Sequence, residues 1–263
     1  MSWKRWLAWL GVLVGLYWVL MFAAALAAYW LHWRPGAFWN LHVVVMVQAA
    51  AVFLSIRIVG GRDAARTVST FKLNPAAVGA IFAGIMIMVM AGILAGAGWL
   101  QAEMVRDLRP FTYVPVLVLV AFYEEYLFRG FLLNAMGRPC IALVISSMLF
   151  GLAHGLNPVA GWAAVIGISL CGLLIGWATL RTGSLWLAVG LHLGWDFCEG
   201  LFFGFPASGL SLPSLLHVTV TGPALVTGGR FGPEAGLILL PGLAVGAGLV
   251  WWYTRIKKPA THS

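Results

Sequence analysis

Charged residues are scarce in this chain. Only 9% of its 263 residues are Asp, Glu, Lys or Arg, whereas 62% are hydrophobic. A soluble domain carries about 25% charged residues. The composition therefore excludes an ordinary soluble domain and predicts a polytopic membrane protein.

Cysteine is scarce as well, and two common metal signatures are missing. Cys140, Cys171 and Cys198 lie within or beside apolar stretches and have no CxxC spacing. This pattern favours buried free thiols over a disulfide framework or a zinc knuckle. The chain also has no HExxH sequence, which is the strongest metalloprotease signature. No linker, low-complexity segment or convincing repeat divides the chain, so we expect one transmembrane domain over residues 1–263.

Long apolar stretches recur along the whole sequence. A helix of about 20 residues crosses the ~30 Å of hydrocarbon in a bilayer, and a helix satisfies its own backbone hydrogen bonds there. We therefore expect an all-α fold of about eight transmembrane helices. The expected spans are residues 6–31, 38–59, 76–100, 112–136, 140–156, 160–180, 184–203 and 235–254. The motif-bearing core lies at about 112–203, and the Gly- and Pro-rich segment at about 204–234 is expected to form an outer-face loop.

The net charge of +8 raises the question of a nucleic-acid partner. With both termini on the cytoplasmic side, however, the inner segments carry eleven of the 16 Lys and Arg residues. The outer segments carry four, namely Arg34, Arg106, Arg109 and Arg230. This distribution follows the positive-inside rule, so the charge indicates membrane topology. We expect the lipid bilayer as a partner and no nucleic acid.

The stretch "AFYEEYLFRG", residues 121–130, places three charges inside an expected span. A charge at the bilayer centre costs roughly 2.5–3.5 kcal/mol on insertion scales. Glu125 and Arg129 are four residues apart and share a helical face, with the acid before the base, which is the favourable order. Glu124 is turned about 100° around the helix axis from Glu125. The spacing therefore predicts a structural pair of Glu125 with Arg129 and leaves Glu124 to find a partner on another helix.

Two further stretches bring polar residues into the spans, namely "FGLAHG" with His154 and "LHLGWDF" with His192 and Asp196. At 1.5 Å per residue, Glu124 lies about 18–20 Å and His154 about 20 Å from the inner end of its span. On the same count His192 and Asp196 lie about 12 and 18 Å from theirs. Three helices thus present polar groups at a similar depth, and we expect these groups to converge.

A buried carboxylate with two imidazoles suits the activation of water. Burial brings a carboxylate towards the range in which a general base works best. One histidine would orient the water, and the other would donate a hydrogen bond to the oxyanion of a tetrahedral intermediate. The set Glu124, His154, His192 and Asp196 would equally supply ligands for a zinc ion. The residue types leave both versions open, so no metal is certain and zinc is possible.

These three stretches resemble the successive motifs of the CPBP family of intramembrane proteases. That family includes type II CAAX prenyl endopeptidases and bacteriocin-processing or self-immunity proteins. Its patterns are EExxxR, FxxxH and Hxxx(N/D). They correspond to Glu124, Glu125 and Arg129, then Phe150 and His154, then His192 and Asp196. Their order and spacing match across residues 121–197.

The resemblance implies a role for each residue. Glu124 and His154 would activate the water, and Glu125 and Arg129 would hold the site together. Phe150 is interpreted as a packing wall. In the family, the histidine and asparagine of the last motif are taken to form the oxyanion hole, which here gives His192 and position 196.

This sequence has Asp196 where the oxyanion role calls for asparagine. An ionised aspartate has no hydrogen to donate. Asp196 would therefore be protonated by burial, orient His192 or bind a metal.

The predicted function is that of an intramembrane endopeptidase. It would cut membrane-associated, prenylated or leader-peptide substrates with a water activated by glutamate and histidine. The alternative is a non-proteolytic immunity or scaffold protein with the same fold. A channel or transporter is a weaker third option because the polar residues gather at one site and do not line a path. The expected location is a bacterial inner membrane, and the sequence does not determine the oligomeric state.

Overall fold

A computed structural model describes residues 3–30, 37–65, 72–135, 138–157 and 159–256, and these are mostly helical. The longer helices are α1 (Trp3–Trp30), α2 (Ala37–Ala65), α3 (Leu73–Gly96), α4 (Val114–Glu125), α6 (Pro139–His154), α7 (Trp162–Thr182), α8 (Leu185–Asp196) and α10 (Leu239–Ile256). The short ones are α5 (Leu133–Ala135), α9 (Ala224–Thr227) and the 3₁₀ turns η1 (Arg109–Tyr113) and η4 (Pro233–Ala235). Two segments are π-helical, η2 (Tyr126–Leu132) and η3 (Phe197–Phe203).

The helical membrane class is confirmed, and the number of crossings stays a prediction. Each of the eight expected spans overlaps a helix of the described chain, and the fourth and seventh continue from α4 into η2 and from α8 into η3. Among the residues that the structure describes, four helices have both the length and the hydropathy to cross a membrane, at Gly11–Trp30, Asn40–Ile58, Leu73–Gly96 and Trp162–Thr182. Pro139–His154 is a shorter apolar helix.

The all-α expectation did not include a pair of short strands. β1 (Leu100–Met104) pairs antiparallel with β2 (Leu216–Val220), with Leu100 opposite Val220. The expected third span therefore ends early, at Gly96. Burial alternates along β2, the period-2 pattern of a half-buried strand. The strand pair ties the segment after α3 to the outer-face loop.

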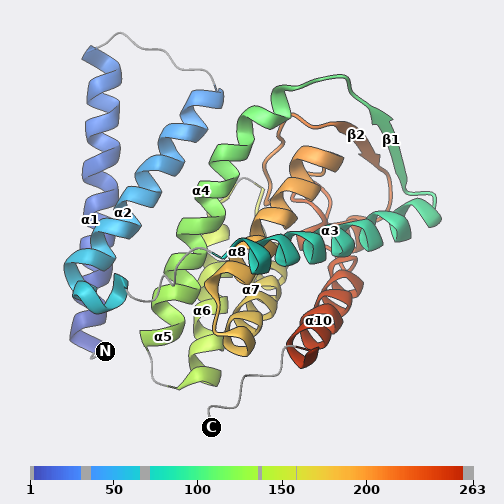
Figure 1. Cartoon of the computed structure of the whole chain (residues 1–263). Helices are drawn as coiled ribbons and strands as arrows, with labels where there is room; N and C mark the ends of the chain where they lie inside the picture. Colours follow the sequence, from blue (N-terminus) through green and yellow to red (C-terminus); the bar gives the residue numbers. More distant parts are fainter. Residues whose placement is uncertain (1–2, 31–36, 66–71, 136–137, 158, 257–263) are drawn as a thin grey trace.

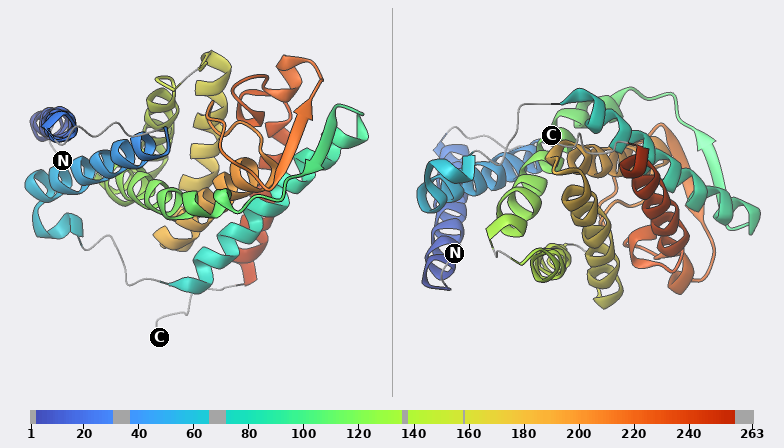
Figure 2. Two further views of the ribbon diagram at one scale, coloured as in Figure 1. Left: turned by 90° about the horizontal axis from the view of Figure 1, so that it is seen from above. Right: turned by 60° about the horizontal axis from the view of Figure 1, so that its bottom comes forward.

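Helix order in space places the motifs centrally. α1 packs on α2, and α2 packs on α4 at one side of the molecule, while β1, β2 and α10 lie at the other (Figures 1 and 2). α6 and α7 pack together between these sides, and α3 crosses α8. The beginning of α1 and the end of α10 lie at the same end of the molecule, opposite the two strands (Figure 1). Arg34, which entered the charge distribution, lies outside the described residues, as do Arg66, Lys257 and Lys258.

α3 and α8 approach each other through small residues. A Cβ atom on Gly190 of α8 would clash with the backbone of Ala76, and one on Gly79 of α3 would clash with the carbonyl of Leu187. Glycine at helix contacts lets two backbones come close in a membrane protein. This contact seats α8, which carries the last motif.

α8 begins at a tight turn encoded by "RTGS". Gly183 ends α7 in the left-handed region with φ 60°, a conformation that glycine adopts at helix ends without steric cost. Ser184 then caps α8, because its hydroxyl oxygen accepts a hydrogen bond from the Trp186 N–H at 3.3 Å. The turn fixes where α8 starts, and therefore the depth of His192.

α4 is preceded by a capped turn. Asp107 accepts hydrogen bonds from the backbone N–H of Arg109 at 2.9 Å and from its Nε at 2.7 Å. These bonds hold the pKa of the Asp107 carboxyl below its usual range. The turn lies outside the expected spans and starts the helix that ends on Glu124 and Glu125.

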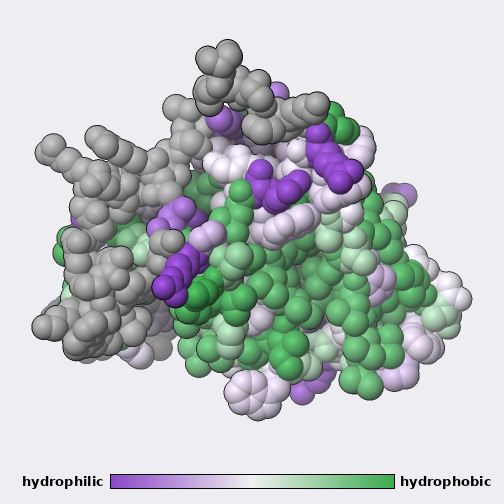
Figure 3. Space-filling model, turned by 90° about the horizontal axis from the view of Figure 1, so that it is seen from below, coloured by the Kyte–Doolittle hydropathy of each residue, from purple (hydrophilic) through white to green (hydrophobic). Residues whose placement is uncertain are grey.

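α6 shows the inverted polarity of a membrane helix. Val144, Met148 and Leu152 are exposed, whereas Ser146 and Ser147 are buried. Exposed apolar side chains in this number are unusual for a soluble monomer and fit contact with lipid. A broad apolar area covers much of the face seen from below (Figure 3). The polar residues of α6 therefore turn towards the interior, where the site lies.

Candidate active site

Glu125 and Arg129 form a fully buried ion pair. Nη1 of Arg129 lies 3.1 Å from Oε1 of Glu125, and both side chains are 0% exposed. Nη2 of Arg129 donates to the Gly172 carbonyl of α7 at 3.1 Å. The guanidinium also lies 4.4 Å from the centre of the Phe150 ring, a favourable cation–π distance. The spacing of the two residues predicts this pair, and the structure adds its contacts with Gly172 of α7 and Phe150 of α6.

The helices that carry the first and the last motif continue into π-helix. η2 follows Glu125 directly, and η3 follows Asp196 directly. Wider turns of this kind are rare and occur frequently at functional sites. The side-chain amide of Asn134 donates to the carbonyls of Arg129 and Gly130 at 3.1 and 2.9 Å, which satisfies carbonyl oxygens at the end of η2. The sequence pattern predicted ordinary helix at both places.

His192 connects both glutamates to Asp196. Its Nδ1 lies 2.8 Å from Oε1 of Glu125. Its Nε2 faces Oε2 of Glu124 at 3.8 Å and Oδ2 of Asp196 at 3.5 Å. The carboxylate of Glu125 accepts from Nδ1–H, and this bond orients the ring so that Nε2 points at the other two acids.

His154 approaches Glu124 from α6. Its Nδ1 lies 2.9 Å from the Phe150 carbonyl, and since a carbonyl only accepts, Nδ1 carries the proton. Nε2 then lies 3.9 Å from Oε2 of Glu124. The Phe150 ring packs edge-on against both imidazoles, with centroids 4.6 Å from His154 and 5.9 Å from His192. Phe150 therefore packs against both histidines and helps to fix the orientation of their rings.

Glu124 occupies the centre of this arrangement. Its Oε1 lies 3.2 Å from the hydroxyl of Tyr123, which also lies 2.9 Å from Oε1 of Gln48. Its Oε2, the atom that both histidines face, is buried and has no hydrogen-bond partner within the described part of the chain. That oxygen has two imidazole nitrogens beside it and no direct hydrogen bond, which is the position of an acceptor for water.

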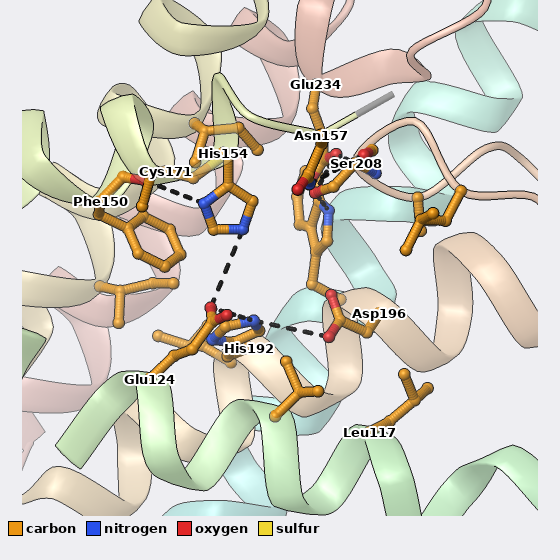
Figure 4. A pocket seen from close by; sticks show the side chains of 18 of the residues that line it. Leu117, Glu124, Phe150, His154, Asn157, Cys171, His192, Asp196, Ser208 and Glu234 are labelled. Carbon is orange, nitrogen blue, oxygen red and sulfur yellow. Dashed lines mark hydrogen bonds and ion pairs between the residues drawn. The ribbon is translucent and has the colours of Figure 1, made fainter. Parts of the chain in front are cut away.

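A cavity of about 400 Å³ opens onto these groups. Glu124 and His192 lie on one side of it, and Asn157, Ser208 and Glu234 lie on the opposite side, with His154 between them (Figure 4). Most of the lining is apolar and comes from α2, α4, α7 and α8. A polar centre inside an apolar cavity is the usual form of a small-molecule or peptide site.

The donor types at the site would suit zinc, and in this structure they lie slightly farther apart than zinc ligands do. Ligands of a tetrahedral zinc lie about 2.0–2.1 Å from the metal, which brings neighbouring ligand atoms within about 3.4 Å of each other. Nε2 of His192 lies 3.5 Å from Asp196 Oδ2 and 3.8 Å from Glu124 Oε2, and Nε2 of His154 lies 3.9 Å from Glu124 Oε2. No group of three or more His, Cys, Asp or Glu side chains is arranged to hold a metal among the residues that the structure describes.

Several polar residues near the cavity lie outside the three motifs, and the sequence pattern did not predict them as site residues. Trp195 donates from Nε1 to Oε2 of Glu199 at 3.0 Å and to Oε1 of Glu234 at 3.2 Å. Both glutamates are buried. The sequence feature that points to them is the scarcity of acidic residues. The chain has only eight, and Glu199 lies inside an expected span.

Comparison with known proteins gives a match over the motif-bearing core. Residues 107–198 match the family model described as type II CAAX prenyl endopeptidase Rce1-like. An uncharacterized protein, YyaK of Bacillus subtilis (strain 168), is 32% identical over 144 residues, which cover 51% of this chain and 45% of that relative. The chain thus matches less than half of the length of this relative. No solved structure matches the chain.

The family match begins before the Glu pair and ends after Asp196, so all three motifs lie inside it. The match supports membership of the CPBP family of intramembrane proteases, the family that the order of the motifs indicates.

Proposed function

We propose that the protein is an intramembrane endopeptidase in which Glu124 and His154 activate a water molecule. The observation that supports this most directly is the unpartnered Oε2 of Glu124, which lies 3.9 Å from His154 Nε2 and 3.8 Å from His192 Nε2. These separations are too long for direct hydrogen bonds. A water at about 2.8 Å from Glu124 Oε2 and from one imidazole nitrogen would bridge either gap.

The reaction follows from these positions. Glu124 takes a proton from the water, and the water oxygen attacks the carbonyl carbon of the scissile peptide bond. The resulting oxyanion accepts a hydrogen bond from Nε2–H of His192. The amide C–N bond then breaks, and the departing nitrogen receives a proton held by Glu124 and His154. No covalent intermediate with the enzyme is needed.

Glu125, Arg129 and Asp196 hold the reacting groups in place. Glu125 is anchored by the buried guanidinium of Arg129 and accepts from Nδ1 of His192. Asp196 faces Nε2 of the same ring. With a carboxylate on either side, both nitrogens of His192 can carry a proton and donate. A bond of this kind to an oxyanion contributes about 10²–10³-fold in rate.

The substrate proposed is a peptide segment that reaches the cavity from the membrane. The cavity is mostly apolar, and its lining includes residues of α2 and α4. Prenylated C-termini, leader peptides and membrane-protein segments are the classes that the family resemblance brings into consideration. Their common chemistry is an apolar peptide that partitions into lipid.

The test compares wild type with Glu124→Gln. The Gln side chain keeps the volume but cannot serve as a base, so cleavage should fall by about 10²–10⁴-fold. Proteomics of membranes that carry each form should show a product of the wild type that is lost in the variant. Glu103→Gln is the matched control because Glu103 is an exposed acid on β1. Chelator treatment and metal analysis of the purified wild type and variant test whether cleavage requires zinc.

Cleavage by Glu124→Gln at the wild-type rate would contradict the proposal. A cellular phenotype that survives the substitution, with no lost product, would instead indicate a binding protein of the immunity or scaffold type.

A further inference from the structure

We propose that Glu234 is a positioning residue. It holds the turn that follows His154 in place relative to α8, the helix that carries His192 and Asp196. The inference rests on the proposed function. Glu234 belongs to η4, in the outer-face loop, and its side chain lines the cavity. It is only 4% exposed. A buried carboxylate in a membrane protein is costly unless it is fully hydrogen-bonded, so its partners indicate what it does.

The first partner is Ser208. Its backbone N–H and its hydroxyl both donate to Oε2 of Glu234, at 2.7 and 2.9 Å. Ser208 has φ 47°, a left-handed conformation that is uncommon for a residue other than glycine. Such conformations cost about 1–3 kcal/mol and persist where the surroundings enforce them. The two bonds from Glu234 therefore hold Ser208 at the edge of the cavity.

Ser208 is in turn joined to the turn that follows His154. The side-chain amide of Asn157 donates to the Ser208 carbonyl at 3.1 Å. The backbone N–H of Asn157 donates to the His154 carbonyl at 3.0 Å. A continuous chain of hydrogen bonds thus runs from Glu234 through Ser208 and Asn157 to the residue proposed to share the water.

The other carboxylate oxygen reaches α8. Oε1 of Glu234 accepts from Nε1 of Trp195 at 3.2 Å. Trp195 directly precedes Asp196 and lies three residues after His192. One side chain therefore contacts α8 directly and reaches the turn after His154 through Ser208 and Asn157. Figure 4 shows Glu234, Asn157 and Ser208 together on one side of the cavity. Misplacement of such groups by about 1 Å can cost about 10²-fold in rate.

The backbone of Glu234 is held separately from its side chain. Its carbonyl packs directly on Gly167 of α7, where a Cβ atom would clash with it. The Gly236 N–H also donates to the Pro233 carbonyl at 3.0 Å. Because the segment is seated by backbone contacts, a change confined to the carboxylate should leave η4 in place.

Glu234→Gln is therefore a sharp test. The carboxylate receives three donors, from Ser208 and Trp195. The Gln amide offers one oxygen and one NH₂ group, so in either orientation a donor faces a donor. Glu103→Gln is again the matched control. Ser208→Ala, which removes only the hydroxyl bond, is the milder variant and remains informative if Glu234→Gln folds poorly.

The experiment measures kcat, KM and hydrogen exchange on full-length protein in detergent or lipid. Glu234→Gln should lower kcat at least tenfold and change KM less than about threefold, because chemistry and not apolar binding is disturbed. Exchange should become faster in peptides covering residues 204–212 and 151–157 together. Combined with Ser208→Ala, the loss in kcat should be clearly less than the product of the single losses, since both changes act on one contact.

Two outcomes would overturn the proposal. They are wild-type kcat in Glu234→Gln, whether or not exchange becomes faster, and fully multiplicative losses in the double variant. If the wild type itself cleaves nothing, the proposed function fails. The exchange measurement then still decides whether Glu234 joins the two segments, because it needs no activity.

Discussion

At the scale of single residues, position 196 distinguishes this chain from the oxyanion arrangement that its motif implies. Asp196 faces Nε2 of His192 at 3.5 Å. An asparagine there could accept from the same nitrogen through Oδ1 and donate to an oxyanion through Nδ2. An alanine could do neither.

Asp196→Asn should therefore keep cleavage within about tenfold of wild type, whereas Asp196→Ala should lose about 10²–10³-fold. The measurement is kcat on one peptide substrate for all three forms. Equal activity of the Asn and Ala variants would show that the side chain at 196 does not act on His192.

The Glu125–Arg129 pair is a matter of stability as well as geometry, because both side chains are 0% exposed. Removal of one partner from a buried ion pair leaves an uncompensated charge and costs about 3–5 kcal/mol. Glu125→Ala and Arg129→Ala should each lower the unfolding temperature markedly. The double variant should be more stable than the sum of the single losses predicts, as thermal unfolding in detergent can measure. Strict additivity would contradict a direct pairing.

At the scale of elements, the contact of α3 with α8 sets where the last motif lies. Ala76 and Ala80 of α3 pack on Gly190 and Gly194 of α8 so closely that Cβ atoms on the glycines would overlap the α3 backbone. The π-helical turn of η3 then follows Asp196 at once. The depth of His192 thus depends on a glycine contact made elsewhere along the same helix.

Gly190→Ala should destabilise the protein by about 1–3 kcal/mol or more, since overpacking displaces backbone. Gly92→Ala is the matched control, because a Cβ atom at Gly92 meets nothing within 4 Å. The control should be neutral or slightly stabilising, as alanine has the higher helix propensity. Thermal unfolding of the two variants side by side makes the comparison, and equal melting temperatures would contradict close α3–α8 packing.

At the scale of the whole molecule, the cavity gathers acidic side chains. The acids that line it are Glu124, Asp196 and Glu234, and no Lys or Arg lines it within the described chain. Arg129 is buried and engaged with Glu125. Two like charges about 6 Å apart repel by about 3 kcal/mol at an effective dielectric constant of 20.

A peptide with Glu next to its scissile bond should therefore be cleaved at least tenfold less efficiently than the same peptide with Gln or Lys there. The values to compare are kcat/KM, with a peptide carrying Glu far from the bond as control. Equal values for the three adjacent residues would mean that the cavity acids are neutral or screened from the substrate.

The sequence by itself determined the helical membrane class, the order of the three motifs and the shared face of Glu125 and Arg129. These features depend on composition and on the periodicity of single helices, which short stretches of sequence contain. Only the tertiary structure decided that Glu124 Oε2 lies between His154 and His192, that β1 pairs with β2, and that Glu234 joins Ser208 to Trp195. Such contacts link residues far apart in sequence, and their distances depend on how the helices pack, where π-helical turns occur and how loops fold back. No local pattern encodes those distances.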